Sequence, residues 1–131
     1  MYIRKSMKKN LEFMFVKIYI YTTFNNTIIT VTNASGNVVT WVSSGCCKFK
    51  GSRKSTPHAA SSVAKKTLEK LLLMLKNNVS KQIQSSIFVK GPGSGAESAI
   101  RVLNSFFIIK SISNITGIPH NGCKPKKMRR V

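Results

Sequence analysis

An alternation of apolar and polar side chains near the start of the chain is the feature that most limits its fold. Residues 15–24 read Phe-Val-Lys-Ile-Tyr-Ile-Tyr-Thr-Thr-Phe, a two-residue period typical of a strand with one buried face. Asn25-Asn26 then predicts a turn, because Asn tolerates positive φ. Residues 27–33 are rich in β-branched side chains, and Val38 to Ser43 follow after a second turn. The first third of the chain therefore predicts a three-stranded antiparallel meander.

The pattern after residue 56 changes to a helical period. Thr56 and Pro57 predict the N-cap and the first position of a helix, whose apolar residues recur at helical spacing from Ala60 to Leu75. We expect Asn77-Asn78 to end this helix, and residues 83–89 to form a fourth strand. A short second helix should follow, because Ser94 and Glu97 have capping-box spacing.

An apolar stretch from Phe106 to Ile115 predicts the fifth strand. The order is thus β-β-β-α-β-α-β, and the two strand–helix–strand crossovers should be right-handed and make their strands parallel. The sequence therefore predicts an α/β fold in which a five-stranded mixed sheet has helices packed on it.

The length of 131 residues suits one domain with terminal extensions. We interpret residues 1–14 as a basic N-terminal arm, 15–118 as a single α/β domain and 119–131 as an extended basic tail held open by Pro119 and Pro125. The start of the chain lacks the apolar core of a secretory signal. No apolar run approaches the roughly 20 residues of a membrane span, so we expect no membrane partner.

The charge balance restricts both chemistry and partners. The chain has 22 Lys and Arg against 3 acids, Glu12, Glu69 and Glu97, and its formal net charge is +19. Paired carboxylates and two-metal sites need side chains that are almost absent here, so we expect no enzymatic activity. So large an uncompensated charge requires an anionic partner, and nucleic acid is the one that basic loops bind through phosphates.

The cysteines do not indicate a metal site. Cys46, Cys47 and Cys123 have no Cys-x-x-Cys spacing, and only His58 and His120 could join them. We interpret the cysteines as free thiols of a reducing compartment, and we expect neither a metal nor a cofactor.

Residues 44–56 are the first candidate RNA-binding segment. The predicted loop carries Lys48, Lys50, Arg53 and Lys54 among small residues that would let another backbone approach closely. Phe49 could stack on an exposed base.

The second candidate is the run from Gly91 to Gly95, which lies between a strand and a helix. Its backbone at Gly93 could contact an RNA phosphate; the alternative is a tight turn that needs unusual φ angles. No Lys follows these glycines as in a nucleotide-binding P-loop, so we expect no nucleotide there.

The tail is the third candidate, because it carries five cations within seven residues. These are Lys124, Lys126, Lys127, Arg129 and Arg130. Extended basic tails of this kind can thread between nucleic-acid helices; the alternative is a patch that resembles a nuclear-localisation signal.

Four blocks of the sequence resemble the family of the eleventh protein of the small ribosomal subunit, in family order and spacing. They are 24–30 (Phe-Asn-Asn-Thr-Ile-Ile-Thr), 51–57 (Gly-Ser-Arg-Lys-Ser-Thr-Pro), 89–95 (Val-Lys-Gly-Pro-Gly-Ser-Gly) and 118–123 (Ile-Pro-His-Asn-Gly-Cys). The resemblance covers roughly residues 15 to 131. It implies a ribonuclease-H-like motif, although an enzyme of that fold would need clustered carboxylates that this chain lacks.

The resemblance also implies a function: a structural protein of the small-subunit platform that bridges several rRNA helices. Such a protein borders the mRNA exit and the Shine-Dalgarno cleft, and its neighbours are the seventh and eighteenth small-subunit proteins. We expect hydrogen-bonding neighbours of the phosphates at Asn25, Asn26, Ser55, Thr56, His120 and Asn121. The alternative is a nucleic-acid-binding protein or RNA chaperone outside the ribosome.

The bias toward Lys, Ile and Asn suggests AT-rich coding, as in an organelle genome. We therefore predict a mitochondrial small subunit, with a plastid as the alternative.

Overall fold

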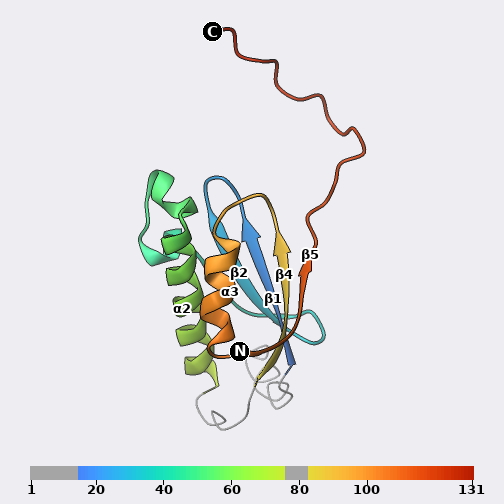
Figure 1. The fold of residues 1–131 in the computed structure, drawn as a ribbon. Coiled ribbons are helices and arrows are strands. Elements are labelled where there is room, and N and C mark those ends of the chain that lie inside the picture. The colour runs from blue at the N-terminus through green and yellow to red at the C-terminus, as the bar shows by residue number, and fades with distance from the viewer. Residues whose placement is uncertain (1–14, 76–82) are drawn as a thin grey trace, which may run out of the picture.

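The computed structural model describes residues 15–75 and 83–131 (Figure 1). The predicted N-terminal arm and the predicted helix end at Asn77-Asn78 lie outside these residues. With labels as in Figure 1, the regular elements are β1 (Phe15–Thr22), β2 (Thr27–Asn33), β3 (Val38–Ser43), α2 (Pro57–Met74), β4 (Gln84–Lys90), α3 (Ala96–Asn104) and β5 (Ile108–Asn114).

The strands form one mixed sheet in the order β3-β2-β1-β4-β5. The pairs β1–β2 and β2–β3 are antiparallel, whereas β1–β4 and β4–β5 are parallel. The predicted α/β class, the meander and the parallel crossovers are therefore confirmed.

Both helices cover the same face of the sheet (Figure 1). Val16, Ile18 and Ile20 point from β1 into the core beneath the helices and are buried, as the alternation predicts. Both crossovers step in the same direction across the sheet, so right-handed connections place both helices on one side. The opposite face has no described helix on it.

Helix α2 begins as predicted. The Thr56 hydroxyl accepts a hydrogen bond from the Ala59 amide at 3.3 Å, and Pro57 occupies the first turn, where its missing N–H costs nothing. Val63, Ala64 and Leu71 lie on the buried face of this helix. Neither helix of the described chain combines the length and the apolar content of a membrane span.

The turn predicted at Asn25-Asn26 is confirmed, but neither residue has positive φ; the Thr23 hydroxyl holds the turn and accepts a hydrogen bond from the Asn26 amide at 2.9 Å. Two other local predictions are wrong. Ser94 does not cap α3, because the N-cap is Gly95 and no side chain bonds there.

The second wrong prediction concerns the start of the fifth strand. The amide of Phe107 donates to the Leu103 carbonyl at 2.9 Å and extends the end of α3, so Phe106 and Phe107 precede β5. Phe107 is buried in the core. Because β5 is an edge strand, most of its side chains are exposed despite their apolar character.

Candidate nucleic-acid interface

The topology brings several chain segments to one edge of the sheet. Strands β1, β3, β4 and β5 all run in the same direction, so their carboxyl ends lie together (Figure 1). We call loops 23–26, 44–56 and 91–95, together with residues 115–118, the carboxyl edge. Every predicted RNA-binding residue lies either on this edge or in the tail that leaves it.

Loop 44–56 is more ordered than the sequence predicts. It contains two short 3-10 helices, η1 (Gly45–Cys47) and η2 (Gly51–Ser55). The buried Ser44 anchors it: the hydroxyl donates to the Lys54 carbonyl at 2.8 Å, and the amide donates to the Thr27 carbonyl at 3.0 Å. Lys48 ends η1 in the left-handed backbone conformation, with a φ of 65°.

The hydrogen bonds within the loop engage the hydroxyls of Ser55 and Thr56 but not the charged side chains. Lys48, Lys50 and Arg53 are exposed, and Lys54 is half-buried. The Thr56 hydroxyl donates to the Arg53 carbonyl at 2.8 Å, and the Ser55 hydroxyl donates to the Ser52 carbonyl at 3.1 Å. The cations therefore project from a braced loop.

Phe49 is half-buried in this loop, and its ring meets the ring of His58 edge to face at 5.8 Å between centroids. No pattern in the sequence predicts this partner. The contact ties the loop to the first turn of α2 and fixes the direction of the Phe49 ring.

Turn 23–26 is built by Thr23, a residue that the sequence analysis missed. Its hydroxyl oxygen accepts from the amides of Asn25 and Asn26 at 3.3 and 2.9 Å, a pattern in which a Thr side chain mimics a turn. Asn26 accepts from the Thr27 amide through Oδ1 at 2.9 Å. The Asn25 side chain is exposed, as is that of Phe24.

The glycines of loop 91–95 allow close packing of backbone on backbone. Gly91 has a φ of +104°, and a Cβ built on it would lie 1.8 Å from the Thr22 carbonyl oxygen. A Cβ at Gly93 would lie 2.7 Å from the Thr23 carbonyl oxygen, and one at Gly95 would lie 2.7 Å from the Cβ of Ala60. Of the three, Gly91 alone has the unusual φ of the tight-turn interpretation, whereas Gly93 and Gly95 have no room for a side chain; this packing joins the loop to β1 and α2.

The tail begins at the same edge but runs away from it. Thr116 accepts a hydrogen bond from the Gly91 amide at 3.1 Å, which ties the base of the tail to the glycine loop. Residues 117–131 contain no helix or strand and are exposed throughout, and the ribbon runs away from the domain (Figure 1). The structure thus groups the loop residues but does not bring His120, Asn121 or the five tail cations beside them.

The charges of the edge have no carboxylate partner within residues 15–75 and 83–131. The one ion pair found there joins Arg101 to Glu97 at 2.5 Å on α3, and both side chains are exposed. Glu69 lies on α2 and forms no such pair with another described residue. The cations of the edge, all on loop 44–56, thus lack a carboxylate partner among the described residues, and an anionic polymer can neutralise them.

The two neighbouring cysteines of η1 are free thiols in different environments. The Ser43 hydroxyl donates to Cys46 Sγ at 3.4 Å and lowers the pKa of that thiol. Burial raises the pKa of Cys47.

Comparison with known proteins gives a consistent match along the chain. The family model described as "Ribosomal protein S11" matches residues 16–130. A small ribosomal subunit protein uS11 from Borreliella burgdorferi is 47% identical over 129 residues, which cover 98% of this chain and 93% of that protein. The uS11 of Treponema pallidum is 46% identical over 132 residues and the full length of both chains. A uS11c from Cyanidioschyzon merolae is 50% identical over 115 residues, 87% of this chain and 90% of that protein.

Proposed function

The chain belongs to the ribosomal protein S11 family, and from that premise we propose that it binds small-subunit rRNA through its carboxyl edge and its tail. It is a protein of the small ribosomal subunit with a structural role in translation. The proposal extends this family role to particular residues of the chain.

One observation carries the proposal. Four separate segments meet at one edge, and the described cations there have no carboxylate partner. A structural protein that joins several RNA helices needs such a surface, because phosphate contacts position a protein on RNA. The phosphate-facing set is Lys48, Lys50, Arg53, Lys54, Lys124, Lys126, Lys127, Arg129 and Arg130.

Hydrogen-bonding groups lie beside these cations. Asn25 presents an exposed side-chain amide on turn 23–26, and Asn26, whose Oδ1 accepts from the Thr27 amide, can donate through its NH₂ group. Ser55 and Thr56 can still accept through a hydroxyl oxygen. His120 and Asn121 begin the exposed tail, where Asn121 has a φ of 62°. Gly93 offers backbone to a phosphate.

We further propose that the protein occupies the platform, bridges several rRNA helices there and borders the mRNA exit and the Shine-Dalgarno cleft. Its neighbours in this proposal are the seventh and eighteenth small-subunit proteins. Family membership supports this placement.

For the compartment we propose a mitochondrial small subunit. The support is compositional: Lys greatly outnumbers Arg, and Ile and Asn are frequent, as AT-rich organelle coding produces. Detection of the chain in small-subunit fractions from purified mitochondria tests this. Its presence in plastid fractions alone would contradict it.

The experiment for the main proposal is sedimentation of native lysate through a sucrose gradient in high salt. A stably assembled ribosomal protein should remain in the small-subunit peak, because its contacts are numerous and partly enclosed by RNA. A free nucleic-acid-binding protein or chaperone would instead move to the top of the gradient, since exposed phosphate contacts weaken steeply with salt.

Replacing Arg53 and Lys54 together by Ala should weaken rRNA binding by about 30-fold. Each side chain should contribute about 1 kcal/mol through a charge-assisted bond to phosphate. The melting temperature should change little, because the loop is braced by Ser44 and by backbone groups that the substitution keeps. Filter binding and circular dichroism measure the two quantities.

The matched control is the double substitution of Lys65 and Lys110 by Ala, which removes the same charge from exposed sites outside the carboxyl edge. It should reduce affinity much less. If the Arg53 and Lys54 variant lost its fold while RNA affinity stayed unchanged, the loop would be structural.

The affinity of the whole protein for rRNA should depend steeply on salt. If the nine proposed cations each neutralise a phosphate, log K against log salt should have a slope of magnitude about 6–8, at about 0.7–0.9 per phosphate. Isothermal titrations at several KCl concentrations measure this slope. A nearly flat dependence would show that phosphate contacts do not dominate.

A further inference from the structure

The face of the sheet opposite the helices carries an aromatic surface that the carboxyl edge does not include. Lys17, Tyr19 and Tyr21 alternate with the core residues of β1 and point to this face. Phe88 and Lys90 lie beside the two tyrosines on β4, in register with them. Tyr21 is 43% exposed, a large fraction for an aromatic side chain in a central strand.

A pocket of about 240 Å³ lies among these aromatic residues, and its lining is Tyr19, Ile20, Tyr21, Phe88, Lys90 and Ile115. The rings of Tyr19 and Phe88 stack with centroids 5.1 Å apart and planes 20° from parallel. The Lys90 ammonium lies 5.9 Å from the centroid of Tyr21. The volume is below the about 300–1,000 Å³ of pockets for drug-sized ligands, so it suits one planar group rather than a large molecule.

The pocket is continuous with the carboxyl edge. Tyr21 and Lys90 lie at the carboxyl ends of their strands, and Lys90 directly precedes loop 91–95. The amide of Ile115 donates to the Val89 carbonyl at 2.8 Å, one residue before the contact of Thr116 with Gly91. An RNA strand whose phosphates lie along the edge therefore passes within reach of this pocket.

We propose that the pocket receives an unpaired rRNA base, which stacks on the ring of Tyr21 beside Lys90. This inference rests on the proposed rRNA binding and adds that the protein contacts a base as well as phosphates. Single-stranded RNA is recognised by aromatic rings that stack on splayed bases, next to cations that hold the backbone.

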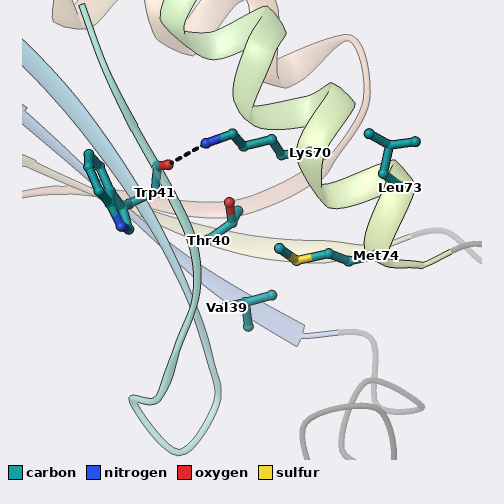
Figure 2. A pocket seen from close by; sticks show the side chains of 6 residues that line it. All are labelled: Val39, Thr40, Trp41, Lys70, Leu73 and Met74. Atoms are coloured by element: carbon teal, nitrogen blue, oxygen red, sulfur yellow. Dashed lines mark hydrogen bonds between the residues drawn. The ribbon is translucent and has the colours of Figure 1, made fainter. Parts of the chain in front are cut away.

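Charge favours RNA over a protein segment as the occupant. Lys17 and Lys90 lie on this face, whereas the described acids, Glu69 and Glu97, lie on helices that cover the other face. A second pocket also pairs an aromatic ring with a cation, because the Lys70 ammonium lies 5.9 Å from the centroid of Trp41 (Figure 2). It lies between β3 and α2, has a volume of about 410 Å³ and is lined by Trp41, Leu73 and Met74 among others. No charge or contact of the described residues indicates what would occupy this pocket between β3 and α2.

The test compares two probes on the full-length protein: a single-stranded oligouridine of about 12 nucleotides, and the same backbone with abasic riboses. Tyr21→Ala should weaken binding of the oligouridine about tenfold, the typical effect of removing one stacking ring. It should leave binding of the abasic probe unchanged, because that probe offers only phosphates. Tyr21→Phe should bind both probes like the wild type.

Trp41→Ala is the matched control, since Trp41 is 54% exposed on the edge strand β3, outside the proposed pocket. It should bind both probes normally. Equal affinity of Tyr21→Ala and wild type for both probes would overturn the inference and leave phosphate binding intact. An equal loss for both probes would also overturn it, because the lost contact would then not be to a base. If the wild type bound neither probe even at low salt, the proposed function itself would fail.

Discussion

Truncation of the chain after Asn121 is expected to reduce rRNA affinity on the order of 100-fold or more while the domain stays folded. The deletion removes five cations, and each neutralised phosphate contributes through counterion release. Part of the binding free energy from these phosphate contacts is offset, because the exposed tail loses conformational entropy when it becomes ordered on RNA. Pro119 and Pro125 limit that loss, since they restrict the unbound chain.

Two measurements separate the tail's electrostatic role from a structural one. The slope of log K against log salt should fall by about 3.5–4.5 units for five phosphates, and thermal unfolding should be nearly unchanged, because residues 117–131 are exposed. A full-length variant with the five cations changed to Gln should behave like the truncation. Wild-type occupancy of the small-subunit peak by the truncated chain would mean that recognition depends on loop 44–56 instead.

Gly91→Ala is expected to have the largest effect on folding. The new methyl group would lie 1.8 Å from the Thr22 carbonyl oxygen, which is a backbone atom and cannot rotate away. Overpacking costs about 1–3 kcal/mol, and a positive φ on a residue with a Cβ adds about 1–2 kcal/mol. The sum of about 2–5 kcal/mol is a large part of the stability of a small domain. Urea unfolding followed by circular dichroism measures it.

Gly36→Ala is the matched control. Gly36 also has a positive φ, +91°, but no atom within 4 Å of the site where a Cβ would lie. Gly36→Ala should therefore lose only the about 1–2 kcal/mol of unfolding free energy that a positive φ costs a residue with a Cβ. If the two substitutions reduced the free energy of unfolding equally, the contact between loop 91–95 and the end of β1 would not stabilise the carboxyl edge.

The fold was predictable because its main signals are local and agree with one another. The alternation in β1 identified the buried face, and Thr56-Pro57 placed the start of α2 at the correct residue. The parallel crossovers then followed from the order of elements and chain handedness. The same reasoning brings the loops after four strands to one edge, although we recognised that grouping only in the structure.

The errors arose where long-range contacts override a local pattern. Ser94 and Glu97 have capping spacing, but α3 starts after Gly95, whose position is fixed by the approach of Ala60 and Thr27. The apolar run from Phe106 includes Phe107, but the Phe107 side chain is buried in the core at the end of α3, and the strand begins only after it. Sequence periodicity over so few residues cannot separate these outcomes.

The exposure of Lys48, Lys50 and Arg53 was predictable from their charge, whereas the hydrogen bonds that support their loop were not. Ser44 holds loop 44–56 through hydrogen bonds to the carbonyls of Lys54 and Thr27. Thr116 holds the base of the tail by accepting from the Gly91 amide. These partners are distant in sequence. Thr23 could have been found, since a Thr shortly before Asn-Asn is a known turn pattern.

Ultraviolet cross-linking of purified small subunits that contain this chain, with mass spectrometry of the cross-linked peptides, tests the central claim most directly. The carboxyl edge and the tail should carry the rRNA cross-links, at loop 44–56, loop 91–95 and residues 119–131. Cross-links confined to the outer faces of α2 and α3, around Lys65 and Arg101, with none on the edge or the tail, would contradict it.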